Sequence, residues 1–458
     1  MAAAAGSTRV PVRLADGFLL AMDAFMRRTG QGEHIPQSAI ELAGAPDLAK
    51  LRGAAQRLVE KHPLLVARLR RNWRTWLPYW QVPNATDRAL PVGLWREKDS
   101  PGALGAEARE VTNAMGALEG IMAQPLDESA GPLNARLDVI ERRDARCLVA
   151  LTWRHLLVDG KGAELLLAEL ARLCDGIDSP PETVEPPLRP LSIREQLSQK
   201  NPAVKRLEEL ARLRIKSVSG PKSRRGRARF QVVTLDAADS DRLKARAEAM
   251  TGALFPMGFY VACAARAHDR VFQSRGQAPG GFVTTVPIQT RKRGARGPLF
   301  HNQVTVFFFG ATRAELATME AASQSMKQQF ADMTRRRLDE SFNAILALMT
   351  RLPAALFMRV VRWQFKGEIC SFFHSHTGAF APEIAEFAGA RITNGFHLPC
   401  LCTPPGSGIF FSERDGRVSV TFSWRNGCLS DAERRLMVAQ TLEDAVGEPR
   451  PELIDANL

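Results

Sequence analysis

The residues best suited to chemistry are His155, Asp159 and Gly160, within the segment Trp-Arg-His-Leu-Leu-Val-Asp-Gly at 153–160. An apolar run comes directly before this segment, and a stretch with helical spacing of apolar residues follows it. A strand is therefore expected to turn into a helix here, with the histidine at the end of the strand. An imidazole held rigidly at such a point is able to accept a proton as a general base. The alternative interpretation is a buried structural histidine followed by an Asp-Gly turn.

The flanking sequence predicts the elements that must position these residues. Residues 135–140 and 147–152 are predicted to be two paired strands across a charged turn, and the second strand leads straight to His155. Residues 163–173 are predicted to form a helix that covers the sheet. Gly160 would permit the turn into this helix and a close approach of a substrate.

The length of the chain, 458 residues, exceeds a single ordinary core, so two large lobes are expected. Its 45% hydrophobic and 24% charged residues are typical of a soluble globular protein. The predicted elements give a mixed lobe at 1–178, a proline-rich and basic crossover at 179–229, and a second mixed lobe at 230–458. Prolines mark the crossover because they cannot continue a helix or a central strand. The predicted fold class is α/β (α+β).

Positive charge dominates the chain, with a formal net charge of +13. Basic residues cluster at 212–229 and again at 291–296, and such clusters attract nucleotide phosphates, an acidic carrier domain or acidic lipid. A solvated basic linker is the favoured interpretation of the first cluster. No groove-reading or zinc-finger pattern accompanies the charge, so nucleic-acid binding is not expected.

Three features make the cytoplasm the expected location. The N-terminus lacks the features of a signal peptide, no apolar stretch is long enough for a transmembrane helix, and seven cysteines, an odd number, favour reduced thiols. Residues 342–361 are strongly apolar but interrupted by Arg351, Pro353 and Arg359. They could lie on a membrane surface, although a pair of core helices kinked at Pro353 is favoured.

The chain resembles the superfamily of CoA-dependent acyltransferases and peptide-synthetase condensation domains, to which wax-ester synthases and alcohol acyltransferases belong. The resemblance runs nearly from end to end and depends on short motifs in the right order and spacing. These motifs are Ala-Asp-Gly-Phe at 15–18, Lys-His-Pro-Leu at 61–64, Pro-Leu-Asp at 125–127 with Gly-Pro-Leu at 131–133, His-x-x-x-Asp-Gly at 155–160, Val-Pro-x-x-x-Arg at 286–291 and His-Asn-Gln-Val at 301–304.

This resemblance implies two lobes like chloramphenicol acetyltransferase, arranged as a V-shaped pseudodimer around a central tunnel. An acyl thioester, on CoA or on the phosphopantetheine arm of a carrier protein, would enter from one side and a small alcohol or amine acceptor from the other. The catalytic motif would comprise His155, Asp159 and Gly160, with His155 as the base in the middle of the tunnel. The thioester is then a co-substrate, and no permanently bound cofactor is expected.

Other residues receive roles from the same resemblance. Asp159 would brace its loop through a charge-assisted pair with Arg291 of the second lobe, rather than act as a second catalytic carboxylate. Asn302 is a candidate donor to the oxyanion of the tetrahedral intermediate or to the substrate, or it orders the end of a strand. Arg154 replaces the first histidine of the family's His-His-x-x-x-Asp-Gly signature, a mostly structural position, and changes the environment of His155.

Two further groups of side chains invite a functional interpretation. The first comprises His374, His376, Cys400 and Cys402, which fit no zinc spacing, so no metal is expected and core or tunnel-lining roles are preferred. The second comprises Trp73, Trp76 and Trp80, which are expected to pack a hairpin against the core rather than form a ligand surface. No cysteine has a recognisable nucleophile setting.

Three functions remain open on the sequence. The first is an acyltransferase that moves an acyl group from a thioester to an alcohol or amine. The second is a carrier-protein-dependent condensation enzyme of natural-product or lipid assembly. The third is a non-catalytic binding protein of the same fold, a reading motivated by Arg154. The lack of a clear Asp-Phe-Gly-Trp-Gly motif argues against the plant-type branch, and peripheral membrane contact stays open.

Overall fold

The computed structural model describes residues 7–84, 86–126, 131–178, 192–220, 226–253, 255–292 and 294–457. Most of the proline-rich segment of the predicted crossover, and its basic residues Lys222, Arg224 and Arg225, lie outside the described residues. Asp127 and Arg293 also lie outside them.

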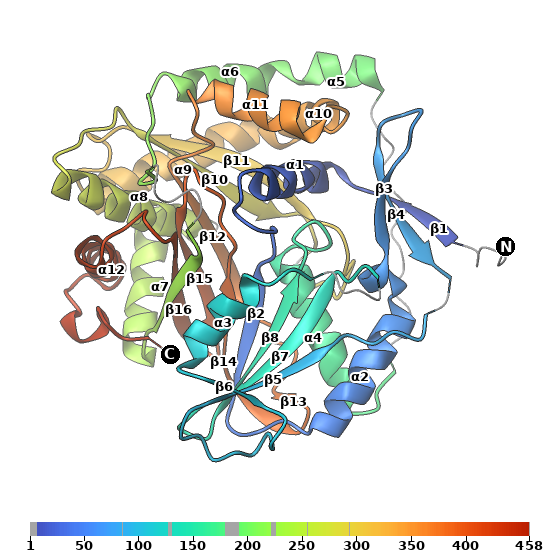
Figure 1. Ribbon diagram of the computed structural model, residues 1–458. Coiled ribbons are helices and arrows are strands. Elements are labelled where there is room, and N and C mark those ends of the chain that lie inside the picture. Colours follow the sequence, from blue (N-terminus) through green and yellow to red (C-terminus); the bar gives the residue numbers. More distant parts are fainter. Residues whose placement is uncertain are drawn as a thin grey trace.

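The first lobe is built on a seven-stranded sheet with the strand order β13-β14-β2-β8-β7-β5-β6. Its strands are β2 (Gln37–Leu42), β5 (Val92–Glu97), β6 (Arg109–Val111), β7 (Ala135–Glu141), β8 (Cys147–Trp153), β13 (Glu386–Phe387) and β14 (Ala390–Leu398). β5 runs parallel to its neighbours β6 and β7, and the other neighbouring pairs are antiparallel. Helices α2 (Leu48–Lys61) and α4 (Gly160–Cys174) pack on one face of this sheet and α3 (Ala114–Met122) on the other (Figure 1).

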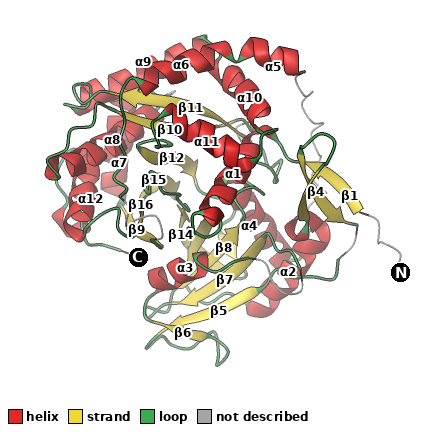
Figure 2. Cartoon of the chain, turned by 45° about the horizontal axis from the view of Figure 1, so that its top comes forward, coloured by secondary structure: helices red, strands yellow, loops and turns green. Residues whose placement is uncertain are grey.

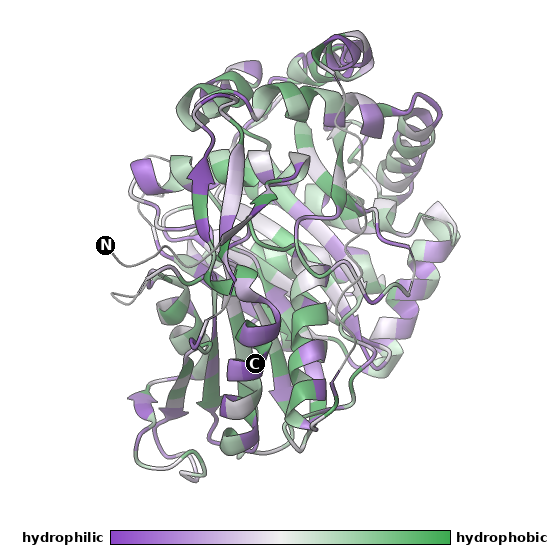
Figure 3. Ribbon diagram, turned by 90° about the vertical axis from the view of Figure 1, so that its right-hand side faces the viewer, coloured by the Kyte–Doolittle hydropathy of each residue, from purple (hydrophilic) through white to green (hydrophobic). Residues whose placement is uncertain are grey.

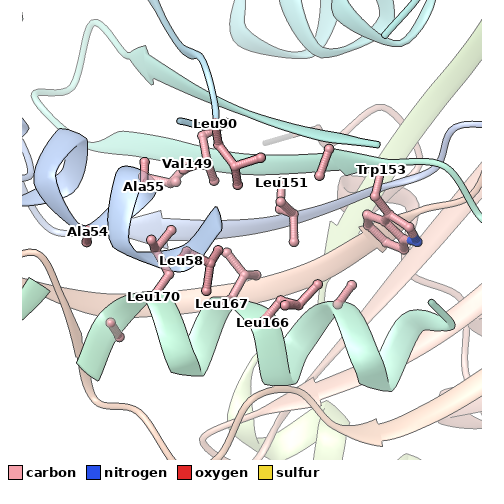
Figure 4. Close-up of a cluster of buried hydrophobic side chains, with 14 of the residues drawn as sticks. Ala54, Ala55, Leu58, Leu90, Val149, Leu151, Trp153, Leu166, Leu167 and Leu170 are labelled. Atoms are coloured by element: carbon pink, nitrogen blue, oxygen red, sulfur yellow. The ribbon is translucent and has the colours of Figure 1, made fainter. Parts of the chain in front are cut away.

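Strand β8, which leads to His155, is covered on both faces. Val149 and Leu151 point toward α2 and α4, where they lie beside Leu58 and Leu166 (Figure 4). The alternate residues of the strand join a second cluster that includes residues of α3 and of the second lobe. Because successive side chains of a strand point to opposite faces, an almost entirely apolar run fits a strand buried on both sides. The predicted strand and the helix after it are confirmed, with the strand at Cys147–Trp153 and the helix at Gly160–Cys174.

The second lobe contains a six-stranded sheet with the order β11-β10-β12-β15-β16-β9. Its strands are β9 (Ala228–Thr234), β10 (Phe282–Gln289), β11 (Val304–Ala311), β12 (Phe372–Ala379), β15 (Ser407–Arg414) and β16 (Arg417–Arg425). Four helices pack on it through one apolar cluster, namely α7 (Ala237–Thr251), α8 (Met257–Ser274), α9 (Met319–Arg335) and α12 (Asp431–Val446). The predicted α/β class and the two lobes are therefore confirmed. In Figure 3 the helices carry both hydrophilic and hydrophobic residues, as expected for helices with one face on a core.

Two segments cross between the lobes. β14 follows β12 of the second sheet in the chain, yet it pairs with β2 of the first sheet, with His397 opposite Ser38. Helix α1 (Leu14–Arg28) packs against α10 (Leu338–Met349) and α11 (Ala354–Gln364) of the second half of the chain (Figure 1). Residues 386–398 thus pair with the first sheet, although they lie within the range 230–458 that is predicted to be the second lobe. β13 and β14 complete the first sheet because they cover the edge that β2 would otherwise expose.

The apolar stretch at 342–361 forms a helix pair, as favoured from the sequence. α10 ends at Met349, and Pro353 is the N-cap of α11. Two short helices, α5 (Ile193–Gln199) and α6 (Asn201–Ala211), lie next to this pair at the same end of the molecule (Figure 2). Among the described residues, no helix combines the length and apolar character needed to cross a membrane.

A three-stranded sheet of β1 (Ser7–Pro11), β4 (Pro78–Pro83) and β3 (Arg68–Arg71) lies beside the first lobe. Trp80 is buried in the core, as predicted. The same prediction is wrong for Trp73 and Trp76, which are 77% and 58% exposed. Both lie in the loop between β3 and β4, where none of the described elements covers them.

Candidate active site

His155 lies in the turn between β8 and α4, at the border of the two lobes. Its backbone N–H donates to the carbonyl oxygen of His34 at 3.1 Å, and its own carbonyl oxygen accepts from Asn302 Nδ2 at 2.9 Å. Leu157, two residues after His155, also bonds to the second half of the chain, because its carbonyl oxygen accepts from the N–H of His301 at 2.8 Å. The backbone around the imidazole is thus held from both lobes.

A cavity of about 1150 Å³ contains His155 in its wall and is lined by residues of both lobes. Apolar side chains of α1, α10 and α11 form much of this wall, including Phe18, Met22, Phe342, Ile345 and Val361. Two groups of exposed residues also line it, Lys292 with Arg296 on one side and Val360 of α11 on another. The cavity therefore reaches the surface beside a basic loop and beside an apolar helix.

Burial lowers the pKa of His155 below the ordinary imidazole value of 6.5. Its own backbone and the carboxylates of Asp159 and Asp16 oppose this shift without cancelling it. Nδ1 is buried and has no hydrogen-bond partner among the described residues. A neutral imidazole at neutral pH has the protonation state that a general base requires.

Hydrogen bonds occupy both carboxylate oxygens of Asp159, which argues against a role as a second base. It is the N-cap of α4, where it accepts from the N–H of Gly162 at 2.7 Å. Arg291 Nη1 donates to its two oxygens at 2.9 and 2.7 Å, and the N–H of Gln303 donates at 2.8 Å. Since Arg291 and Gln303 follow β10 and precede β11, this one carboxylate joins the two lobes.

Gly160 is the first residue of α4 and has no positive φ, so the turn does not require its conformational freedom. An added Cβ would lie 3.4 Å from Cε1 of His397, an ordinary contact distance, so the packing does not require a glycine here either. Gly162 is more tightly constrained: a Cβ there would lie 2.4 Å from the carbonyl oxygen of Leu299. Gly162 could not be singled out from the sequence, since a glycine within the first turn of a helix carries no local signal.

Asn302 ties the lobes together. Its Nδ2 donates to Oδ1 of Asp16 at 2.7 Å and to the carbonyl oxygen of His155 at 2.9 Å. Both partners are acceptors, so the amide must present its two protons to them and has none left for an oxyanion. Asp16 of α1 also accepts from His301 Nδ1 and from the N–H of Asn302, each at 2.9 Å. The geometry therefore favours the strand-ordering alternative for Asn302 over oxyanion binding.

Arg154 lies 3.3 Å from Glu33, and its Nε donates to the carbonyl oxygen of Leu133 at 3.4 Å. Glu33 precedes His34, so Arg154 braces the loop between α1 and β2.

Two histidines that the sequence analysis did not assign line the same cavity. The ring of His34 lies 4.9 Å from that of His155, centroid to centroid, and burial, with the neighbouring His155, lowers the pKa of His34 well below its ordinary value. His397 is hydrogen-bonded to Ser38 Oγ at 2.8 Å and to Glu164 Oε1 at 2.9 Å. No local pattern identifies these residues, because their partners lie on distant parts of the chain.

Glu164 is fully buried beneath the cavity wall. Burial raises its pKa, but hydrogen bonding to His397, the charge of Lys161 and the N–H of Ala381 bring it below the ordinary value. The carboxylate is therefore held in its charged form next to His397.

The remaining candidates from the sequence also lie at this cavity or in the core. His374, His376 and Cys400 line the cavity, and Cys402 is buried nearby. Burial lowers the pKa of His374 to about 3 and that of His376 to about 4, and it raises that of Cys402 to about 12. Within the described part of the chain, no cluster of side chains could hold a metal ion.

Comparisons with known proteins match the fold and not the sequence. No family model matches the chain, and no curated protein matches it. The first condensation domain of the calcium-dependent antibiotic synthetase, in complex with a substrate analogue, superposes with a TM-score of 0.64 at 16% identity, over 99% of this chain and 100% of that one.

Two other solved structures have similar scores. For the trichothecene 15-O-acetyltransferase of Fusarium sporotrichioides the TM-score is 0.67 at 11% identity, over 97% and 96% of the two chains. For polyketide synthase associated protein 5 of Mycobacterium tuberculosis it is 0.59 at 13% identity, over 95% and 98%. The chain has the two-lobed fold of condensation domains and of this acetyltransferase.

Proposed function

We propose that the protein is an acyltransferase that moves an acyl group from a thioester to an alcohol or amine, with His155 as the general base. The observation that carries the proposal is a neutral imidazole in the wall of a cavity that both lobes form. The fold is consistent with it, because the similar structures include a condensation domain and an O-acetyltransferase.

In the proposed reaction, the oxygen or nitrogen of the acceptor attacks the carbonyl carbon of the thioester. Nε2 of His155 takes the proton from that oxygen or nitrogen as the new bond forms. The tetrahedral intermediate then expels the thiolate of the donor. The imidazolium of His155 gives its proton to the sulfur of that thiolate, which leaves as a free thiol. Such proton transfer is typically worth roughly 10²–10⁴ in rate. Asp159 and Arg291 act by positioning the turn that carries His155.

The donor is proposed to enter beside the basic loop. Lys292 and Arg296 are exposed, line the cavity and form no ion pair with a described carboxylate. Their charge would attract the phosphates of CoA or the phosphodiester of a phosphopantetheine arm. Replacing both by alanine should raise KM for such donors while leaving kcat nearly unchanged, because the two side chains bind a part of the donor that does not react.

A carrier-dependent condensation enzyme is the second candidate, and the likeness to condensation domains favours it. Parallel assays with acyl-CoA and with acyl carrier protein, read out by release of free thiol against pooled alcohols and amines, separate the two donors. The proposal requires that at least one donor is consumed and that His155→Gln abolishes most of the turnover in a normally folded protein.

A non-catalytic binding protein is the third candidate, motivated by Arg154. The contacts of Arg154 argue against it, because this side chain pairs with Glu33 and leaves the ring of His155 facing the cavity. Tight ligand binding without consumption of any thioester would favour this candidate over the first two.

A further inference from the structure

Helix α11 presents an apolar stripe to solvent. Leu356 and Val360 are 45% and 40% exposed, and Trp363 is 78% exposed. Residues four and seven positions apart lie on one face of a helix, so the three side chains form a single stripe. The neighbouring residues Phe357 and Met358 are buried and anchor the helix to the protein.

A basic groove of about 580 Å³ runs along this helix, between it and the end of α1. Its polar lining consists mainly of Arg28, Arg359, Arg362 and Lys366. Arg28, Arg359 and Lys366 form no ion pair with a carboxylate among the described residues. Arg362 lies over the ring of Phe25, 5.2 Å from its centroid, and close enough to Glu368 to lower the pKa of that carboxyl, which burial raises. The groove therefore keeps an excess of positive charge.

The same end of the molecule carries further exposed aliphatic side chains. Ile193 and Leu197 lie four residues apart on α5, which packs against α10 (Figures 1 and 2). A protein face that lies in the headgroup region of an anionic bilayer typically combines apolar side chains with unpaired cations, as this face does.

Val360 connects this face with the cavity, because it is exposed on α11 and also lines the cavity that contains His155. The wall between Val360 and His155 is largely apolar. An apolar molecule dissolved in a bilayer could thus pass from α11 into the cavity without entering water. A second copy of the chain is a poor occupant, because it would bring like charges together. A soluble acidic carrier would satisfy the charge but would leave this apolar path unused.

We propose that α11 docks the protein on a membrane surface that contains anionic phospholipid. The four basic side chains of the groove contact lipid phosphates, and Leu356, Val360 and Trp363 enter the boundary between headgroups and acyl chains. Docking does not depend on the proposed acyl transfer, so the two proposals can fail separately.

The test is flotation of the full chain with vesicles of phosphatidylcholine, with or without phosphatidylglycerol. The wild type should float with the anionic vesicles and much less with the neutral ones. The variant Arg359→Glu/Lys366→Glu should lose at least about tenfold in affinity, since each cation near an anionic surface contributes roughly fivefold. The variant Leu356→Ser/Trp363→Ser, which keeps every charge, should also lose affinity.

The matched control is Lys50→Glu/Arg270→Glu, which makes the same change in net charge on the exposed surfaces of α2 and α8, away from α11. It should keep affinity within about twofold, and His155→Gln should float like the wild type. Failure of the wild type to float with anionic vesicles overturns the proposal. So does an equal loss in the control, or binding of a soluble acidic carrier protein to this face in place of vesicles. Thermal unfolding of each variant separates lost docking from lost folding.

Discussion

The carboxylate of Asp159 lies 2.7 Å from the guanidinium of Arg291, although 132 residues separate them in the sequence. Both side chains are almost completely buried. An ion pair in this setting adds little net stability, because each charge has lost its water, and its strength lies in fixing geometry. The pair holds α4, the turn of His155 and the end of β10 in one arrangement, which is the arrangement that encloses the cavity.

Breaking this pair from one side should be costly. Arg291→Ala leaves a buried carboxylate without its partner and is expected to lower the free energy of unfolding by about 3–5 kcal/mol. The double variant Asp159→Asn/Arg291→Met should lose less than the sum of its single changes, because it leaves no unpaired charge. Urea denaturation measures both. As a control, Arg52→Ala removes the exposed pair with Glu107 and should cost less than about 1 kcal/mol; an equal cost at both sites would contradict the bracing role.

The lowered pKa of His155 predicts the pH dependence of turnover. A general base acts in its neutral form, so activity should fall only as the pH drops below the ordinary value of 6.5 and protonates the ring. His155→Gln should lose roughly 10²–10⁴ in kcat, and its residual activity should not show the acid limb. Rate profiles of the two proteins from acid to neutral pH test this. A mutant with unchanged turnover would remove His155 from the mechanism.

Buried neutral histidines predict a loss of stability in acid. Burial lowers the pKa of His62, His268 and His376 to about 4, whereas an unfolded imidazole titrates near 6.5. Between these values the unfolded chain binds protons that the folded chain does not. Stability should therefore fall as the pH drops below about 6.5, by about 1.4 kcal/mol per pH unit for each such histidine, until about pH 4.

His268 offers a direct check of that slope. Its ring is hydrogen-bonded to the carbonyl oxygen of Ala264 at 2.7 Å and to Ser407 Oγ at 2.9 Å, away from the cavity. Between about pH 6 and pH 5, the unfolding free energy of His268→Gln should fall less steeply than that of the wild type, by about 1.4 kcal/mol per pH unit. This difference corresponds to one proton fewer taken up on unfolding. Urea denaturation at these two pH values gives the slopes. An unchanged slope would show that His268 does not stay neutral in the folded protein over this pH range.

Gly162 should tolerate no side chain. A Cβ at this position would lie 2.4 Å from the backbone oxygen of Leu299, which cannot rotate away. Gly162→Ala is expected to cost about 1–3 kcal/mol in unfolding free energy and to reduce turnover by shifting the contact between α4 and the second lobe. Gly53→Ala is the control, since nothing lies within 4 Å of a Cβ there, and it should be neutral or stabilising by up to about 1 kcal/mol. Similar effects at both glycines would refute the steric argument.

The order of apolar and polar residues predicted the structure correctly where it depends on a single strand or helix. The run before His155 predicted β8 and the spacing after it predicted α4, because burial on both faces and helical periodicity leave a direct trace in residue order. The same reasoning was wrong for Trp73 and Trp76, since an aromatic residue in a loop carries no sign of whether another element covers it. For Asn302 the sequence left two roles open, and the choice between them depends on Asp16 and His155, which engage both of its amide protons.

The amino-acid sequence by itself determined the strand–turn–helix that carries His155, with Asp159 as the cap of α4, because these depend on neighbours a few residues away. The tertiary structure alone decided which surfaces meet: β14 beside β2, Asp16 against Asn302, and His397 between Ser38 and Glu164. These contacts join residues far apart in the chain, and their geometry depends on how two separate cores pack. No local pattern encodes that packing, and the cavity around His155 exists only because of it.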